Sequence, residues 1–513
     1  MVTLDGRSLT CSQVRDLATG KAAARLAEQG RERARAAAEV AGSVAASRPV
    51  YGRTTGVGAN RDQRVAEHDL AGHGLRLLRS HAGGAGPLVA AELSRAMLVV
   101  RANQIAAGGS GVDPGVLNVL ADGINNGMSV PVPKYGAIGT GDLTALAATA
   151  LCLLGERDWL PGSAALPGSA ALPGSAALPG SAALPGSAAQ PRFPLAPGDA
   201  LAFLSSNAAT IGEAAIACAD LAGLLDAAIV IGALSHLATD ASAEPHAAPV
   251  HDARPFPGQQ AVAATLRGLL AGESLPPARI QDPYGFRALP QVHGPAVDAV
   301  RAAGLAVTIE LNAAAENPLI DVPRRTAWHN GNFHSAYLGL ALDAVRAALF
   351  QAAALSAARL GTLVEPAFTR LPAFLATDPA PSSGIMILEY VAHSAIADMR
   401  RLATPAALGS AVLSRGIEEH AGFATQSARA TTEVVGAYRI VLACELVAAV
   451  RALRLRARVP ASQVLAEAMS RAATLPPQTA DRALDADLAL ATDLLPEFEL
   501  LAEAARDAGP GPD

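Results

Sequence analysis

The chain has 513 residues and a mass of 51.8 kDa, enough to bury a large core. Apolar residues make up 51% and charged residues 17%, a balance that excludes a disordered chain. Forty basic and 46 acidic side chains give a net charge of −6 with no basic block, so nucleic acid is not expected as a partner.

The four cysteines are scattered without a CxxC pair, which favours a reducing, cytoplasmic compartment. The polar N-terminal sequence lacks the apolar core of a signal peptide. The two most apolar stretches, Ala214–Leu237 and Tyr337–Ala358, each contain charged residues, which are costly at the centre of a bilayer. We therefore expect buried helices of a soluble protein and no membrane partner.

Apolar residues recur every three or four positions through most of the chain, which predicts helices. In chain order these are Val14–Ala46, Ala90–Ala107, Leu143–Leu154, Ala208–Leu237, Pro295–Ala315, Ala336–Leu360, Ile385–Leu402 and Ser427–Arg458. Such lengths are typical of an all-α protein built as a long antiparallel helical bundle. We expect a loop-rich N-terminal part over residues 1–200, a central bundle over 201–475 and a short helical tail over 476–513.

One segment differs from the rest in kind. Between Leu160 and Ala189 the hexapeptide LPGSAA occurs five times in perfect tandem. Proline and glycine in every copy exclude a continuous helix or strand. We expect an inserted surface loop without a catalytic role.

Polar residues lie beside glycines at several places in the helical pattern. The loop Tyr51–Asn60 is rich in glycine but lacks the lysine of a phosphate-binding loop. The loop Gly136–Asp142 leads into a predicted helix, which Asp142 is placed to cap. Each loop taken alone is also consistent with a simple turn.

Further along, Tyr284 and Arg287 are three residues apart and would share one helical face, where an arginine suits a carboxylate. Polar clusters follow at Glu310–Asn312, Glu316–Pro318, Asn330–His334, Glu389–Tyr390 with Asp398, and Glu418–His420. The last has no HExxH spacing, so we expect no metal site. Each cluster has a structural alternative, such as a satisfied polar group at a helix end.

Together, in this order and spacing, these segments resemble the ammonia-lyase and aminomutase family that includes histidine, phenylalanine and tyrosine ammonia-lyases. The resemblance spans almost the whole chain, from the YGxxTGxG loop to the EEH segment. The motifs that carry it are RANQIAAGGSGV (101–112), QDPYGFRALPQVHG (281–294), ELNAAAENPLI (310–320) and NGNFH (330–334). It implies the family's all-helical, fumarase- and aspartase-like fold and a homotetramer.

The resemblance also implies roles for individual residues. Tyr51 would be the catalytic base and Arg287 would hold the substrate carboxylate, while Tyr284 lines the site and Phe333 packs near the electrophile. The remaining candidates for the substrate site are Gln281, Asn207, Asn312, Asn332, Asp398 and Glu418. The sequence Arg79-Ser80-His81 is similar to that of histidine lyases and some tyrosine aminomutases, so His81 would bond a polar ring; a histidine on a helix face is the alternative.

The family's electrophile, 4-methylideneimidazol-5-one, forms from an internal Ala-Ser-Gly, and here this chain departs from the pattern. Its loop is one residue shorter, and Gly139-Thr140-Gly141 takes the place of the triad. Nearby, Ser205 replaces the asparagine expected from the resemblance, and Asn207, two residues on, is a candidate substitute. We expect no intact electrophile and no other cofactor.

Three hypotheses remain at this point. The chain is a lyase-like enzyme that acts on an amino acid or related carboxylate by elimination, addition or isomerisation without the electrophile. Alternatively, it is an ordinary histidine or tyrosine ammonia-lyase or aminomutase with an electrophile derived from Thr140. The third hypothesis is a non-catalytic homologue.

Overall fold

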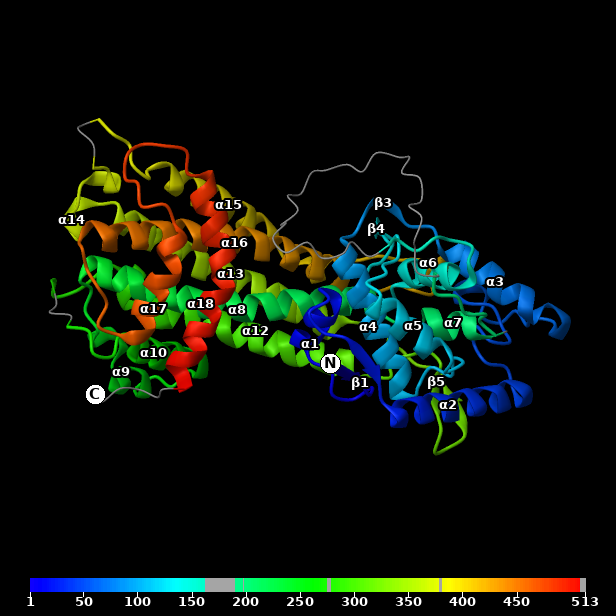
Figure 1. The fold of residues 1–513 in the computed structure, drawn as a ribbon. Helices are drawn as coiled ribbons and strands as arrows, with labels where there is room; N and C mark the ends of the chain where they lie inside the picture. Colours follow the sequence, from blue (N-terminus) through cyan, green and yellow to red (C-terminus); the bar gives the residue numbers. More distant parts are fainter. Residues whose placement is uncertain (162–189, 197, 275–277, 378–380, 508–513) are drawn as a thin grey trace. The chain divides into compact units, whose positions relative to one another are not determined.

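The computed structural model describes residues 1–161, 190–196, 198–274, 278–377 and 381–507 (Figure 1). The repeat from Leu160 to Ala189, apart from its first two residues, lies outside these ranges, so the expectation of a surface loop there is not addressed. The described chain is mainly helical, as the sequence predicts. It divides into two compact units: unit 1 comprises Met1–Ile216, Gly304–Leu340 and Ala406–Ala428, and unit 2 comprises Ala217–Ala303, Ala341–Pro405 and Arg429–Asp513.

Unit 1 holds short helices and three two-stranded pairings, of which β1–β2 is parallel while β3–β4 and β5–β6 are antiparallel. Its helices are α1 (Cys11–Ala18), α2 (Glu28–Ser47), α3 (Leu70–His81), α4 (Ala91–Ala107), α5 (Val116–Asn125), α6 (Leu143–Leu154) and α7 (Asp199–Leu204). Its strands are β1 (Val2–Leu4), β2 (Ala24–Leu26), β3 (Ala85–Leu88), β4 (Pro133–Tyr135), β5 (Leu319–Asp321) and β6 (Thr326–Trp328). Its 3-10 turns are Gly58–Asn60, Glu67–Asp69, Ala406–Leu408 and Ser414–Gly416.

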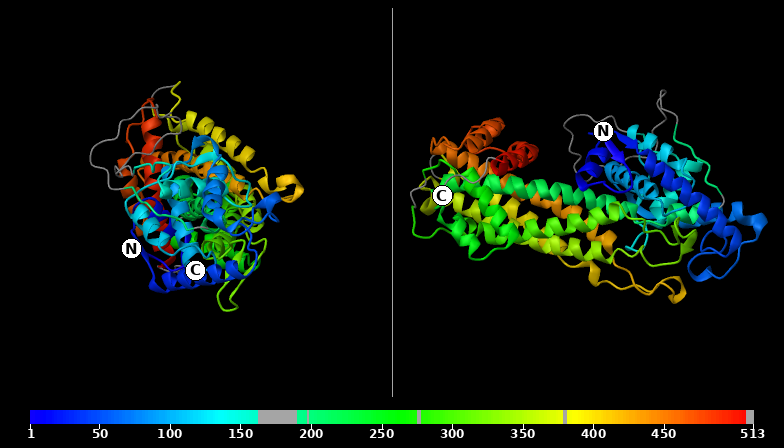
Figure 2. Two further views of the ribbon diagram at one scale, coloured as in Figure 1. Left: turned by 90° about the vertical axis from the view of Figure 1, so that its right-hand side faces the viewer. Right: turned by 90° about the horizontal axis from the view of Figure 1, so that it is seen from below.

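Unit 2 is built around long helices that lie side by side in every view (Figures 1 and 2). Most of each long helix belongs to this unit: α8 (Ala208–Thr239), α12 (Leu289–Leu311), α13 (Ala336–Leu363) and α16 (Ala424–Leu455). The shorter helices are α9 (Ala248–Asp252), α10 (Pro257–Leu269), α11 (Tyr284–Arg287), α14 (Pro366–Thr369), α15 (Ile387–Leu402), α17 (Gln463–Arg471) and α18 (Asp485–Asp507). Its 3-10 turns are Glu244–His246, Ala373–Leu375 and Ala472–Thr474.

The predicted boundaries of the long helices agree with the structure to within three residues, except near the N-terminus and at α12, which the sequence predicts over Pro295–Ala315 and which spans Leu289–Leu311. The apolar period predicts one helix over Val14–Ala46, but this stretch forms α1, the strand β2 and α2. Gly20 follows α1 with a φ of +77°, a left-handed conformation that stops the helix and turns the chain into β2. The prediction of a single helix is therefore wrong, because the apolar period continues across the break.

Helix α4 is the buried centre of unit 1 and packs against α1, α2 and α5. Arg101 on this helix is fully buried and forms an ion pair with Glu316, with 3.0 Å between Nη1 and Oε1. The same guanidinium donates to the carbonyls of Ala202 and Phe203. Arg101 thus fixes the segment that leads directly into Asn207.

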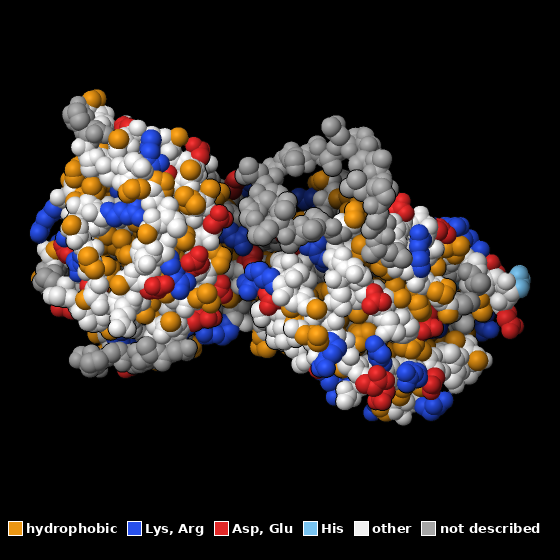
Figure 3. All heavy atoms as spheres, in the orientation of Figure 1, with side chains coloured by type: hydrophobic (Ala, Val, Ile, Leu, Met, Phe, Trp, Pro, Cys, Tyr) orange, Lys and Arg blue, Asp and Glu red, His pale blue; other side chains and the backbone are white. Residues whose placement is uncertain are grey.

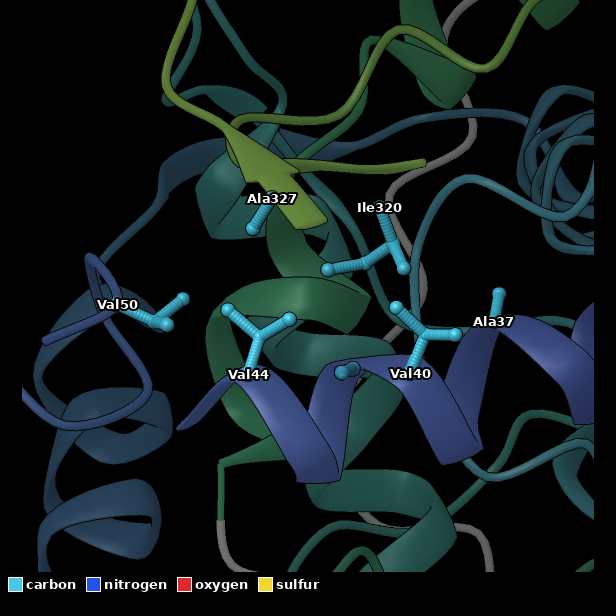
Figure 4. Packing of buried hydrophobic residues seen from close by; sticks show 7 residues of the cluster. Ala37, Val40, Val44, Val50, Ile320 and Ala327 are labelled. Carbon is cyan, nitrogen blue, oxygen red and sulfur yellow. The ribbon is translucent and has the colours of Figure 1, made fainter. Parts of the chain in front are cut away.

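One face of α2 anchors the chain just before Tyr51. Ala37, Val40 and Val44 of this face pack against Ile320 of β5 and Ala327 of β6. Val50, at the end of the same cluster, is also buried (Figure 4). Burial of these side chains therefore positions the residue that precedes the predicted base.

Two helical stretches, Asp199–Thr239 and Ala336–Leu363, are long and apolar enough to cross a membrane by length and composition alone. Their most apolar windows are 83% and 50% buried inside the structure, and buried core helices of soluble proteins pass the same test. On the face shown in Figure 3, basic and acidic side chains are interspersed with apolar ones.

Glu310, at the end of α12, is a partly buried acid whose pKa burial raises to about 6. Because the folded pKa lies above the ordinary value of 4.5, the cost of the charged carboxylate is absent below pH 4.5 and grows as the pH rises through 6. We expect Glu310→Gln to raise the melting temperature at pH 8 and to give no gain at pH 4. The exposed Glu39→Gln is the control, and an equal shift of Glu310→Gln at both pH values would contradict the assignment.

Candidate active site

Tyr51 is held at both its backbone and its phenol. Its backbone N–H donates to His329 Nε2 at 3.2 Å, and its Oη accepts the Gly58 N–H at 2.7 Å. Burial raises the pKa of Tyr51, and the nearby Glu418 carboxylate raises it further, while the Gly58 N–H acts in the opposite direction. The phenol is therefore protonated at neutral pH, with one hydrogen-bond donor already placed to stabilise its anion.

The segment around Glu418 contacts the Tyr51 loop through a short hairpin. Leu413 and Glu418 pair at its base, and Ser414 Oγ accepts the Ala59 N–H at 3.0 Å. A Cβ on Gly58 would lie 2.5 Å from Ser414 Oγ and 3.4 Å from Glu418 Oε1. Glycine at position 58 therefore allows the hairpin to approach the Tyr51 loop. In this way the structure brings Tyr51 and Glu418, two of the predicted site residues, close to each other.

The loop Gly136–Asp142 is tied down through nearly every peptide group. Four successive carbonyl oxygens accept hydrogen bonds from four residues in three segments of unit 1. The pairs are Gly136 with Thr144 Oγ1 (3.0 Å), Ala137 with Gln426 Nε2 (2.9 Å), Ile138 with the Phe423 N–H (2.8 Å) and Gly139 with the Ser335 N–H (3.2 Å). The backbone of this loop is therefore fixed from several sides before any ligand binds.

Asn207 completes the clamp on the other side of Thr140. Its Oδ1 accepts the Gly141 N–H at 2.8 Å, and its Nδ2 donates to the Phe333 carbonyl at 2.6 Å. Asn207 thus joins the Gly139–Gly141 turn to the NGNFH segment, where Phe333 is half-buried and Asn332 is exposed. The predicted site segments therefore meet through hydrogen bonds to backbone atoms.

Asp142 stands at the start of α6, but its side chain does not cap this helix. Its carboxylate accepts hydrogen bonds from the backbone N–H and the hydroxyl of Thr210, at 2.7 and 2.9 Å. The capping role predicted for Asp142 is therefore wrong, because a buried partner on α8 takes the carboxylate. The effect is to fasten the loop to α8.

Two other predicted residues of unit 1 have different surroundings. Both ends of the Asn312 amide are used within the protein, with Leu9, Asn103 and Thr308 as partners. His81 ends α3 and its Nδ1 lies 2.8 Å from the Leu77 carbonyl oxygen. The hydrogen bonds described above join the Tyr51 loop and the Gly136–Asp142 loop to their neighbours. Neither His81 nor Asn312 takes part in those hydrogen bonds.

Tyr284 and Arg287 lie in unit 2, on the single turn α11. The Arg287 guanidinium carbon lies 4.5 Å from the centroid of the Tyr284 ring, a cation–π contact. Within the described chain no protein acceptor is found for the buried Arg287 Nε. An arginine that is stacked and has no carboxylate partner in this part of the chain is suited to bind an anion.

The other unit 2 candidates are exposed. Gln281 precedes α11, and Asp398 on α15 faces Arg401 across a weak 3.7 Å pair. No group of three or more His, Cys, Asp or Glu side chains suited to a metal ion is found among the residues described.

A family model described as aromatic amino acid lyase matches residues 9–474 of this chain. The chain belongs to this family. Histidine ammonia-lyase of Anaeromyxobacter dehalogenans (strain 2CP-C) is 37% identical over 511 residues, which cover 97% of this chain and 99% of that protein.

Among solved structures, histidine ammonia-lyase from Trypanosoma cruzi matches with a TM-score of 0.85 and 26% identity, over 99% of this chain and 95% of that one. Tyrosine aminomutase from Streptomyces globisporus also gives a TM-score of 0.85 and 26% identity, over 100% and 99% of the two chains. The family assignment makes the chain a carbon–nitrogen lyase and agrees with the all-helical fold.

Lyases of this family use an electrophile formed from Ala-Ser-Gly, and the loop of this chain does not fit that triad. Gly139 has a φ of +85°, and a Cβ at this position would lie 2.6 Å from the backbone nitrogen of Ala424. An alanine therefore meets both an unfavourable backbone conformation and a backbone atom that cannot move aside. Thr140 adds a methyl group at the carbon that the family's electrophile presents to its nucleophile.

Sequence reasoning alone does not identify several residues that hold this site, among them Ser335, Gln426, Ser414 and Thr210. Ser335, Gln426 and Ser414 each act through a hydrogen bond to a peptide group far away in sequence, whereas Thr210 donates two hydrogen bonds to the Asp142 carboxylate. No local pattern marks such contacts. Their neighbours Phe333 and Glu418 are found only through the motifs.

The steric argument at Gly139 predicts the cost of an added methyl group. Gly139→Ala should destabilise unit 1 by more than the matched Gly20→Ala, for which we expect about 1–2 kcal/mol. Gly20 has a similar φ of +77°, but a Cβ at this position would have no atom within 4 Å. Urea unfolding measures both variants, and equal losses would show that the contact with Ala424 is harmless.

Proposed function

We propose that this protein is an ammonia-lyase-like enzyme that acts on an amino acid or a related carboxylate by elimination, addition or isomerisation, without a methylideneimidazolone electrophile. The observation that supports the proposal is the turn at Gly139–Gly141, where an alanine at position 139 would meet a left-handed backbone conformation and the backbone nitrogen of Ala424. Asn207 joins this turn to Phe333 through two hydrogen bonds to backbone atoms.

The missing electrophile restricts the substrate. Without it, the α-amino group stays a poor leaving group and the β-proton is far too weakly acidic for a tyrosine base. Tyr51 can act on a proton that the substrate's own carbonyl acidifies, or on a substrate with a better leaving group than ammonia. We therefore expect very slow turnover of histidine, tyrosine and phenylalanine.

In the proposed mechanism Tyr51 accepts and returns the proton. The Gly58 N–H at 2.7 Å stabilises the phenolate that forms, which partly offsets the effect of burial on the pKa of this phenol. Glu418 would exchange protons with Tyr51 or hold the substrate's amino group. Thr140, in its uncyclised form, contributes a hydroxyl between the two clamped glycines.

Arg287 would bind the substrate carboxylate while Tyr284 stacks against the guanidinium and offers a second phenol as acid or base. His81 would bond a polar ring, and Asn207 would act through the two backbone groups that it holds. The proposed binding set is completed by Gln281, Asn332 and Asp398, while Asn312 would act through the backbone groups that its amide holds.

We propose a homotetramer, which is supported by large apolar side chains that remain exposed on neighbouring turns of α12 and α13, namely Leu305, Ile309, Tyr337 and Leu340. We propose a cytoplasmic location with no membrane or nucleic-acid partner.

A second candidate function is an ordinary histidine or tyrosine ammonia-lyase or aminomutase with an electrophile derived from Thr140. It is favoured by histidine ammonia-lyase relatives that are 36% and 37% identical along nearly their whole length. A third is a non-catalytic homologue, which would bind amino acids or carboxylates and release no product. The mass of the Gly139–Gly141 segment separates the first two candidates, because formation of the electrophile removes two waters. A ligand screen combined with a search for product separates the third.

The carboxylate contact is tested by Arg287→Lys. Lysine keeps the charge but loses the planar fork, so we expect about tenfold weaker binding of L-histidine, which corresponds to about 1.4 kcal/mol. L-Histidinamide, which lacks the carboxylate, should bind both forms equally. The exposed Arg301→Lys in the same unit is the control, and calorimetry that shows no loss for Arg287→Lys would remove Arg287 from the site.

A further inference from the structure

The turn α11 presents two proposed site residues but has little structure of its own. It spans only Tyr284–Arg287, closed by the Arg287 N–H to Pro283 and the Ala288 N–H to Tyr284. One turn is far below the length at which a helix is stable in isolation. Its orientation must therefore come from what lies beneath it.

The buried side of α11 rests on an arginine. Gly285 and Phe286 face inward, and the Gly285 carbonyl accepts a hydrogen bond from Arg359 Nη1 at 3.2 Å. A Cβ on Gly285 would lie 2.8 Å from Arg359 Cγ, so the glycine backbone packs directly on this side chain. Phe286 meets the ring of His236 edge-on, with 5.1 Å between centroids.

Arg359 is itself held by a buried carboxylate. It forms a two-pronged pair with Glu445, at 2.6 and 2.7 Å, and both side chains are at most 4% exposed. The two Glu445 oxygens also accept the hydroxyls of Ser235, at 2.8 Å, and Ser356. Helices α8, α13 and α16 therefore all converge on one carboxylate.

Such a pair is a poor source of net stability, because removing two charges from water costs about as much as their attraction returns. A fully hydrogen-bonded buried pair does, however, fix geometry. The third guanidinium nitrogen, Nη1, donates to the Gly285 carbonyl in the peptide that joins Gly285 to Phe286. The buried and rigidly held guanidinium of Arg359 therefore donates a hydrogen bond to the backbone of α11.

We propose that Arg359, held by Glu445, is a positioning residue that fixes α11 so that Arg287 and Tyr284 are set for a carboxylate ligand. The proposal rests on the proposed function of Arg287 and adds the device that orients it. Arg359 acts through the Gly285 carbonyl and touches no ligand.

A matched control exists on the same helix. Arg346 on α13 is also fully buried and pairs with the carboxylate of Asp343, but the carbonyls to which it donates belong to Leu402 and Thr404 rather than to α11. Arg359→Lys and Arg346→Lys each keep the charge and lose the fork. We expect similar losses of melting temperature for the two variants.

Ligand binding separates them. Arg359→Lys should weaken the binding of L-histidine at least fivefold and leave the binding of L-histidinamide unchanged. Arg346→Lys should change the affinity for neither ligand by more than twofold. In an Arg287→Lys background, Arg359→Lys should add no further loss, because the positioned group is already gone. Glu445→Gln is the second variant, should Arg359→Lys fail to fold, and it should show the same dependence on the carboxylate.

The outcomes distinguish this inference from the proposed function. If Arg287→Lys weakens L-histidine but Arg359→Lys does no more than Arg346→Lys, the positioning role is overturned and the carboxylate contact stands. If Arg287→Lys has no effect, the carboxylate contact falls and the positioning role falls with it. If Arg359→Lys weakens the binding of L-histidine and L-histidinamide to the same degree, the inference is also overturned. Such a result would indicate general damage to the fold.

Discussion

The peptide groups of Gly136–Asp142 are the constraint around which the candidate site is arranged. Four consecutive carbonyls and two N–H groups of this loop are paired with separate segments of unit 1. Because the backbone is held on so many sides, the left-handed conformation of Gly139 and its contact with Ala424 cannot relax. The loop therefore requires glycine at position 139. This requirement accounts for the departure from the alanine of the family's triad.

Buried arginines perform a related task in both units. Arg101 ties the chain before Asn207 to Glu316 in unit 1, and Arg359 ties α11 to Glu445 in unit 2. In each case the guanidinium satisfies a carboxylate and backbone carbonyls together. Loss of one partner would leave an uncompensated buried charge, a cost that can reach about 3–5 kcal/mol. These two buried ion pairs therefore lie close in the chain or in space to residues proposed to bind substrate.

Much of the fold could be predicted from the sequence, since helix periodicity is a local property. The helix predicted at Leu143–Leu154 has the same bounds in the structure, whereas Val14–Ala46 fails because the pattern does not reveal the left-handed turn at Gly20. The family resemblance pointed to Tyr51, Glu418, Asn207 and Phe333 as site residues, and the structure places all four in unit 1. The partners that hold them, such as Ser414 and Gln426, depend on distant contacts that no local pattern encodes.

The central claim, that Gly139-Thr140-Gly141 remains an ordinary backbone, is tested most directly by the mass of the tryptic peptide Tyr135–Arg157 from the purified protein. Trypsin cuts after Lys134 and Arg157, so this peptide contains the whole loop. We predict the mass given by its sequence, with fragment ions that run uninterrupted through Thr140. A peptide lighter by two waters, with the loss localised to residues 139–141, would contradict the account and restore the ordinary ammonia-lyase chemistry.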